Sequence, residues 1–126
     1  MSTFYDLQNV NKTFVRGGER LNVLSNLNLI INEGEFICVM GPSGSGKSTL
    51  FNILGGLDRP DSGKVISFGK DLSTLSNRAL DHLRSRQIGF IFQFYHLIPV
   101  LTAYQNVEIP LLLTSLSKKE RKRKIE

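Results

Sequence analysis

The sequence of 126 residues contains a single cysteine and no tryptophan. Cys38 therefore has no partner for a disulfide within the chain, which fits a reducing compartment. No segment approaches the length of a membrane span, and the N-terminus lacks the charged-then-apolar pattern of a secretory signal. The two histidines, His82 and His96, have no second ligand at the spacing of a zinc site. These absences favour one small cytosolic domain, or part of a larger one.

An excess of positive charge is also missing from most of the chain. The net charge is +5, but six of the 16 Lys and Arg residues lie within residues 118–124. Residues 1–117 contain 10 basic and 9 acidic residues, which leaves a net charge of +1. A short basic run of this kind is typical of a solvated helix face, so we expect no nucleic-acid partner.

Glycine, in contrast, is present in an informative pattern. Residues 41–49 read GPSGSGKST, which matches G-x-x-x-x-G-K-[ST] with Gly41, Gly46, Lys47 and Ser48 on the fixed positions. Such a loop directs backbone N–H groups toward a polyphosphate, because glycine permits the backbone conformations that this requires. Lys47 can then reach the β- and γ-phosphates, and the Ser48 hydroxyl can bind Mg²⁺. The pattern therefore predicts a binding site for ATP and Mg²⁺.

The flanks of this loop have the context that the pattern requires, a strand before it and a helix after it. Residues 35–40 form a short apolar run, which predicts a strand buried on both faces, as in a parallel sheet. After the loop, four apolar residues fall on one helical face, and Gly55 and Gly56 then weaken the helix. The four residues are Leu50, Ile53, Leu54 and Leu57. The fold class indicated is α/β.

Further strands are expected before and after the loop. Two of them alternate like half-buried strands, and the second places Leu27, Leu29 and Ile31 on one face. Residues 16–20, which contain Gly-Gly, predict a hairpin tip between these two. The expected strands are residues 3–10, 22–31, 64–68 and 88–92.

Helices are expected in the second half of the chain. Ser76 is a typical N-cap, and its helix is expected to run to about residue 86. Ser117 and Glu120 form the S-x-x-E pattern of a capping box. The helix that follows reaches the last residue after about two and a half turns, a marginal length for an isolated helix. The pattern therefore predicts that the chain stops inside an element.

A second group of motif residues follows the strand expected at residues 88–92. Gln93 stands there before clustered aromatics and a proline, in FQFYHLIPVLTAYQNVEIPL. Together with the loop, the NVNKTF segment that ends at Phe14 and the LGGLDRPDSGKV segment, this resembles the nucleotide-binding subunits of ABC transporters. The segment around Gln93 is most similar to the mainly bacterial subfamily that works with macrolide-efflux and lipoprotein-release permeases. The resemblance covers essentially the whole chain.

The resemblance implies a P-loop NTPase fold of the ABC type, in its N-terminal part. Residues 1–35 would form mainly an antiparallel β subdomain. Residues 36–93, from the phosphate loop to the glutamine loop, would form part of the parallel-sheet core. Residues 94–126 would begin a helical subdomain that is truncated here.

The resemblance also implies roles for single residues. Phe14 would stack on adenine, where the family usually has tyrosine, because stacking needs only a π-face. Alternatively, Phe14 is an ordinary strand residue without a ligand, because aromatic residues are common in strands. Lys47 and Gln93 would be catalytic, and Ser48 and Gln93 would bind the metal, with Gln93 sensing the γ-phosphate. The nucleotide would contact Phe14, Gly41, Ser43, Gly44, Ser45, Gly46, Lys47, Ser48 and Thr49.

Two protein partners follow from the same resemblance. A second copy of the subunit would form a homodimer that closes over two ATP molecules. The residues after Gln93 would receive a cytoplasmic helix of a membrane permease, although they equally fit the start of a helical core. The subunit would lie at the inner face of the cell membrane. Its ATP hydrolysis would drive substrate export, or extraction of a lipoprotein or peptide, through the permease.

Three parts of the family's hydrolysis machinery are missing from the sequence. It has no LSGGQ-type signature, no apolar run that ends in Asp-Glu, and no histidine late enough to be the switch histidine. We therefore expect little or no hydrolysis by this chain alone, because the base and the transition-state clamp are absent. The strand before the phosphate loop would lack a neighbour and expose apolar faces, which favours a marginal fold or self-association.

Three alternatives stay open. The chain could be a nucleotide-binding module without hydrolysis. It could also be another P-loop enzyme such as a small-molecule kinase, although an Arg-rich lid is expected there in place of the aromatics after Gln93. An ABC ATPase of DNA repair is the third, and the near-neutral body of the chain disfavours it.

Overall fold

The structure is a computed structural model that describes residues 2–126. Within these residues the chain divides into two compact units, one that ends at Gly89 and one that spans Phe90–Glu126. The boundaries expected after residues 35 and 93 from the resemblance stay predictions.

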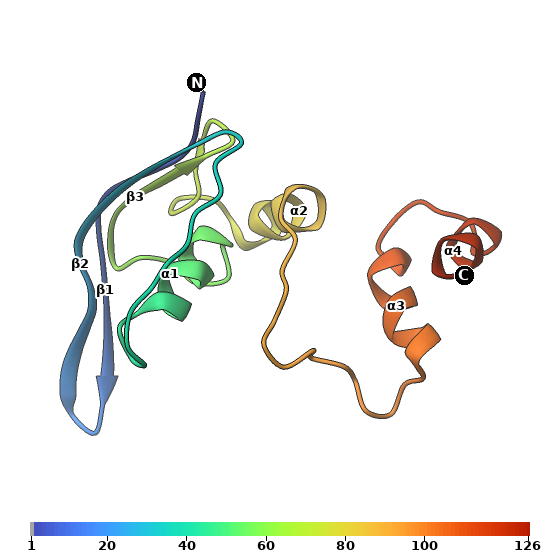
Figure 1. The fold of residues 1–126 in the computed structure, drawn as a ribbon. Coiled ribbons are helices and arrows are strands. Elements are labelled where there is room, and N and C mark those ends of the chain that lie inside the picture. Colours follow the sequence, from blue (N-terminus) through green and yellow to red (C-terminus); the bar gives the residue numbers. More distant parts are fainter. Residues whose placement is uncertain (1) are drawn as a thin grey trace. The chain divides into compact units, whose positions relative to one another are not determined.

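A long β-hairpin forms the framework of the first unit (Figure 1). Strand β1, Thr3–Arg16, pairs antiparallel with β2, Glu19–Asn32. The two residues between them, Gly17 and Gly18, have φ values of 59° and 86°. A two-residue turn with both φ values positive matches the right-handed twist of the strands, and glycine adopts it without steric cost. The strands predicted at residues 3–10 and 22–31 and the hairpin tip predicted within residues 16–20 are confirmed, but both strands are longer than predicted and leave only two residues in the tip.

Two further strands complete a four-stranded antiparallel sheet in the order β2-β1-β3-β4. Strand β3, Ser62–Ser67, pairs with β1, and the two-residue strand β4, Lys70–Asp71, pairs with β3. The strand predicted at residues 64–68 is thereby confirmed. The register between β1 and β2 shifts at several points, as it does at β-bulges in antiparallel pairs.

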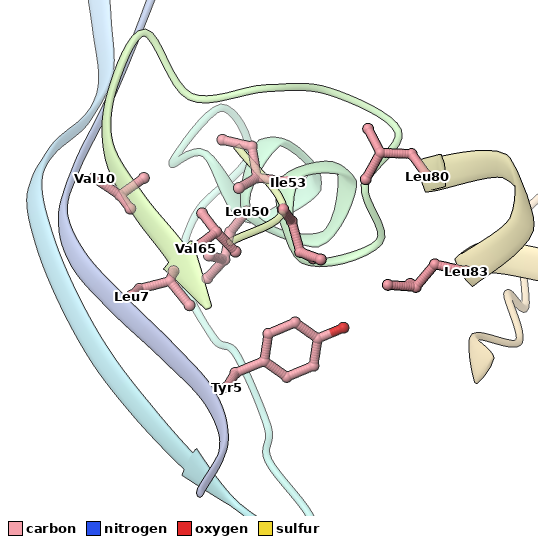
Figure 2. Packing of buried hydrophobic residues seen from close by; sticks show 9 residues of the cluster. Tyr5, Leu7, Val10, Leu50, Ile53, Val65, Leu80 and Leu83 are labelled. Carbon is pink, nitrogen blue, oxygen red and sulfur yellow. The ribbon is translucent and has the colours of Figure 1, made fainter. Parts of the chain in front are cut away.

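Two helices cover one face of this sheet and complete the core. They are α1, Lys47–Leu54, and α2, Asn77–Gln87. Figure 2 shows side chains of β1, β3 and both helices pointing toward one another. Leu27, Leu29 and Ile31 of β2 pack against this cluster, as predicted. The buried core residues are Tyr5, Leu7, Val10, Leu50, Ile53, Val65, Leu72, Leu80 and Leu83.

Helix α1 keeps three of the four apolar residues expected on its inner face. Leu50 and Ile53 are buried, and Leu54 packs against the core. The placement of Leu57 on this face is wrong, because the helix ends at Leu54 and Leu57 is 47% exposed. Gly56, with a φ of 63°, ends the helix in the left-handed conformation that glycine readily adopts. The chain therefore turns away before Leu57 can join the core.

The buried strands expected at residues 35–40 and 88–92 do not form. Neither segment pairs with any strand in the described part of the chain. Phe36 is 95% exposed, and Cys38 and Ile91 are exposed as well. A parallel strand is stable only with ladder partners on its edges and cover on both faces. Without such partners most of these apolar side chains are solvent-exposed, as expected for the segment before the phosphate loop, and only Val39 and Ile88 pack against the core.

The second unit consists of two helices with short connections. They are α3, Ala103–Leu112, and α4, Lys118–Ile125. Arg121 joins them, because its Nε lies 3.2 Å from Glu108 Oε1 and its guanidinium donates to the Leu116 carbonyl oxygen at 2.8 Å. None of residues 90–126 is buried. This unit therefore has helices but no closed core of its own.

All helices after α1 begin with side-chain caps. The predicted cap at Ser76 is confirmed, because its hydroxyl accepts from the Ala79 N–H at 3.3 Å. The capping box predicted at Ser117 is also confirmed, with Glu120 as its second member. Thr102 forms a second capping box with Gln105 at the start of α3. Helix α3 is not among the helices predicted from the sequence, although the T-x-x-Q pattern indicates its start.

Candidate phosphate-binding site

The candidate site is the loop of residues 41–46 together with the N-terminus of α1. Gly46 is the N-cap of this helix, with a φ of 88°, and no side chain caps the helix. The first turn contains no acidic residue. The positive end of the helix dipole is therefore not compensated by the chain's own side chains, which favours an external anion.

Contact with β2 fixes the start of this helix. A Cβ atom at Gly46 would lie 2.9 Å from Val23 Cγ1 and 3.0 Å from the Val23 carbonyl oxygen. A side chain there would force Val23 to shift, and the positive φ also disfavours one. Glycine at this position therefore lets the loop backbone pack directly on the sheet.

The backbone N–H groups of the loop are largely available for a ligand. In the loop, the Ser45 N–H donates to the Pro42 carbonyl oxygen at 3.2 Å. The other N–H groups from Ser43 to Gly46 find no acceptor among residues 2–126. The first N–H groups of a helix also lack intrahelical acceptors. The available donors belong to Ser43, Gly44, Gly46, Lys47, Ser48 and Thr49.

Lys47 folds back over the loop. Its Nζ donates to the carbonyl oxygens of Gly41 at 2.8 Å and Pro42 at 2.7 Å, and lies 3.4 Å from Ser45 Oγ. All three acceptors are neutral, and no ion pair among the described residues involves Lys47. The positive charge of Lys47 is therefore held at the loop without a carboxylate that neutralises it. An anion bound in the loop would supply the missing negative charge.

The residues present fit a metal–nucleotide complex better than a bare metal ion. No three His, Cys, Asp or Glu side chains gather into a metal site in the described part of the chain. Mg²⁺ keeps several waters and is usually bound through substrate phosphates with one or two protein ligands. The Ser48 hydroxyl, in the first turn of α1, would be the ligand that the loop supplies.

The turn that leads into the loop segment is held by a carboxylate. The Glu35 side chain accepts from the Asn32 backbone N–H at 2.8 Å and from the Asn32 side-chain amide at 3.0 Å. These hydrogen bonds lower the pKa of Glu35 from its ordinary value, the side-chain bond most strongly. The negative charge of Glu35 therefore fastens the end of β2 just before the chain enters the segment that carries the loop.

Phe14 lies on β1 near the hairpin tip, opposite Leu21 of β2. It is 42% exposed, so its ring is accessible to a ligand. The Leu21 position is two residues from Val23, which touches Gly46, and that is roughly 7 Å along a strand. The structure therefore brings the expected adenine-stacking residue and the phosphate loop to neighbouring positions on the hairpin.

Gln93 belongs to the second unit, where its side chain is exposed. Its expected action on Mg²⁺ or water at the phosphate loop stays a prediction. The residues that follow are largely apolar and exposed, as expected for a docking segment or an uncovered helical core. They include Phe94, Tyr95, Leu97, Ile98 and Val100.

Comparison with known proteins decides the family. The sequence model described as "ABC transporter" matches residues 24–126, which include the phosphate loop, Gln93 and all elements from the middle of β2 onward. The chain belongs to the ABC transporter family. No helix of this ABC chain within the described residues is long and apolar enough to cross a membrane.

Curated ABC proteins show the same similarity. YvrO of Bacillus subtilis strain 168, an uncharacterized ABC transporter ATP-binding protein, is 47% identical over 118 residues. These residues are 94% of this chain and 52% of YvrO. MacB of Salmonella typhimurium strain LT2, a macrolide export ATP-binding/permease protein, is 48% identical over 121 residues. That alignment covers 96% of this chain and 19% of MacB.

A solved ABC structure confirms the fold. The ATP-binding cassette MJ0796, in a dimeric post-hydrolysis state bound to ADP and Pi, matches with a TM-score of 0.88 at 45% identity. The match covers 97% of this chain and 54% of that one. The expected fold, the N-terminal part of an ABC nucleotide-binding domain, is thereby confirmed. This ABC chain spans about half the length of YvrO and MJ0796.

Lys12 of this ABC chain is not among the candidate site residues predicted from the sequence. Its Nζ lies over the Phe14 ring, 5.3 Å from the ring centroid. The spacing i, i+2 on a strand places Lys12 and Phe14 on one face, so their contact could have been predicted from the sequence. The partners of Lys12 after α1, Asp58 and Asp61, were not foreseeable from local patterns.

Proposed function

We propose that this chain binds ATP together with Mg²⁺ at residues 41–49. The observation that carries the proposal is the set of unpaired N–H groups at the start of α1, with the Lys47 ammonium held over the same loop by neutral carbonyl oxygens. Lys47 would leave these carbonyls for the β- and γ-phosphates, and the Ser48 hydroxyl would bind Mg²⁺. The ADP and Pi bound by MJ0796 support a nucleotide as the ligand.

Phe14 would hold the adenine. Its accessible ring belongs to the β1–β2 hairpin, and β2 also contacts Gly46. One nucleotide would therefore reach the ring with its base and the loop with its phosphates. Stacking on a phenyl ring needs no hydrogen bond from the base, and an offset aromatic pair contributes about 1 kcal/mol. Phe14 therefore adds affinity for the base, and the loop supplies the larger electrostatic part.

In the complete protein, the bound ATP would be hydrolysed to drive transport. Lys47 would stabilise charge on the transferred phosphoryl group, and the Gln93 side-chain oxygen would contact Mg²⁺ or orient the attacking water. A second copy of the subunit would close over the nucleotide, and the dimeric MJ0796 structures support that partner. The signature, the Asp-Glu pair and the switch histidine do not occur in this sequence. This chain alone would therefore bind ATP with little or no turnover.

The transport step would be export, or extraction of a lipoprotein or peptide, through a membrane permease. Support comes from MacB, whose name joins macrolide export with an ATP-binding and a permease part. The exposed apolar residues after Gln93 would receive a helix of the permease, since large apolar side chains rarely stay exposed on a monomer. The subunit would then lie at the inner face of the cell membrane.

Calorimetric titration with ATP and Mg²⁺ tests the binding proposal. We expect saturable binding by the unmodified chain and loss of binding in Lys47→Ala. Lys64→Ala is the matched control, because Lys64 is an exposed lysine on β3 and lies outside residues 41–49. Equal binding by Lys47→Ala and Lys64→Ala, or no binding by any of the three, would contradict the proposal.

Phosphate release separates the two functional readings. If this chain is a binding module without hydrolysis, ATP is bound but no phosphate appears above the level of Lys47→Ala. Turnover that depends on Lys47 and Gln93 would instead show that the missing parts are dispensable. A kinase would transfer phosphate to an added acceptor, which neither ABC reading predicts.

A further inference from the structure

We propose that Lys12 is a positioning residue for recognition of the nucleotide base, because it fixes the ring of Phe14. This inference rests on the proposed function, in which Phe14 stacks on adenine. The contacts of the Lys12 ammonium are with the turn after α1 and with Phe14, and not with the phosphate loop. Its effect would therefore appear in the affinity for the base and not in the affinity for the phosphates.

Lys12 is anchored to the turn that follows α1. Its Nζ donates to Asp58 Oδ1 at 2.9 Å and to the Arg59 carbonyl oxygen at 2.7 Å, and lies 3.8 Å from Asp61 Oδ1. The side chain is only 12% exposed. Three oxygen atoms around one ammonium leave a long, flexible side chain little freedom, so its head has a defined position.

The same ammonium also meets the ring of Phe14. The distance of 5.3 Å from Nζ to the ring centroid lies within the range of a cation–π contact. The ring has no polar atom with which to hold its own orientation. A fixed cation on one ring face therefore stabilises one orientation and leaves the opposite face for an aromatic ligand.

The backbone near Phe14 is tied to the same turn. The Thr13 N–H donates to Asp61 Oδ2 at 2.6 Å, and the Asp61 N–H donates to the Asn11 carbonyl oxygen at 2.8 Å. The turn continues from helix α1, which begins at the phosphate loop. Lys12 thus lies at the junction between the strand that carries the ring and the helix whose other end binds the phosphates.

Two ligands separate a positioning role from a structural one. ATP with Mg²⁺ carries the base, whereas inorganic tripolyphosphate with Mg²⁺ offers phosphates alone. In calorimetry on the full chain, we expect Lys12→Met to weaken ATP binding about threefold and to leave tripolyphosphate binding unchanged. Lys12→Arg keeps a cation that can pair with Asp58 and stack on the ring, so it should restore ATP binding.

Phe14→Leu distinguishes failure of this inference from failure of the proposed function. If Phe14→Leu weakens ATP but not tripolyphosphate, while Lys12→Met changes neither, Phe14 binds the base and the positioning role is wrong. If Phe14→Leu leaves ATP binding unchanged, the proposed role of Phe14 fails and the inference fails with it. An equal loss of both ligands in Lys12→Met, with a lower unfolding temperature, would show a purely structural residue and overturn the inference.

A double-mutant cycle gives a second readout. Once Phe14 is leucine, the aromatic ring is absent, so adding Lys12→Met should weaken ATP binding no further. An additional loss as large as in the unmodified chain would mean that Lys12 acts independently of the ring, which contradicts the proposal.

Discussion

The two units of the chain are built in different ways. The first has every buried residue of the described chain, drawn from strands and helices far apart in the sequence. The second has two helices with capping boxes and a single ion pair between them, and nothing in it is buried. Local signals alone are therefore enough to start helices, but only the first unit adds the long-range packing that holds a site.

The candidate functional residues are divided between these two units. The phosphate loop and Phe14 belong to the packed unit, where β2 contacts Gly46 directly. Gln93 belongs to the unit without a core. We therefore expect the phosphate and base contacts to be preformed, whereas the residues after Gln93 need a further surface to cover them. Four experiments sharpen this comparison, beginning with the largest expected effect.

Truncation of a buried isoleucine should show the difference in packing between the two units most clearly. Ile53→Ala removes a fully buried side chain behind the phosphate loop and should lower the free energy of unfolding by about 3 kcal/mol. Ile91→Ala makes the same chemical change at a fully exposed position and should change it by less than about 0.5 kcal/mol. Urea unfolding followed by circular dichroism measures both. Equal effects would show that the second unit has a core as well.

Two glycines with the same backbone angle test the contact between loop and sheet. Gly46→Ala places a methyl group against Val23 at a φ of 88° and should cost about 2 kcal/mol and abolish ATP binding. Gly18→Ala, at a φ of 86° with no atom within 4 Å, should cost only about 1 kcal/mol from backbone strain. Binding by calorimetry and unfolding in urea give the two readouts. Retained ATP binding in Gly46→Ala would contradict the preformed site.

The N-caps should behave differently in the two units. Ser76→Ala removes the cap of α2, which packs on the core, and should lower the stability of the first unit by about 1 kcal/mol. Ser117→Ala should reduce the helicity of α4 without moving the main unfolding transition, because no buried residue depends on that helix. Circular dichroism and NMR chemical shifts distinguish these results. A shift of the main unfolding transition in Ser117→Ala would show that the two units unfold together, which contradicts this expectation.

The smallest effect is a pH dependence of α4. Hydrogen bonds from the Ser117 hydroxyl, and then from the Ser117 backbone, lower the pKa of Glu120. The cap therefore contributes fully above the ordinary pKa of 4.5 and is lost as the pH falls through the lowered value. We expect the chemical shifts of α4 to move toward coil values in that window. Glu120→Gln keeps a capping-box residue without a charge, so its helix should not respond.

Local patterns predicted much of the first unit. The strands, the Gly-Gly hairpin tip and the Ser76 cap depend on neighbouring residues, and the phosphate-loop motif defined the candidate site itself. The strand expected at residues 35–40 failed because a parallel strand depends on partners elsewhere, which no local pattern contains. The ion pair of Lys12 with Asp58, 46 residues apart, escaped prediction for the same reason.

Hydrogen exchange with and without ATP and Mg²⁺ tests the central claim most directly, because it reports on both units in one experiment. We predict slow exchange in β1 and β3, rapid exchange throughout residues 90–126, and slower exchange at residues 43–49 once the nucleotide is added. Protection of residues 90–126 equal to that of the sheet, or no nucleotide effect at residues 43–49, would contradict the account.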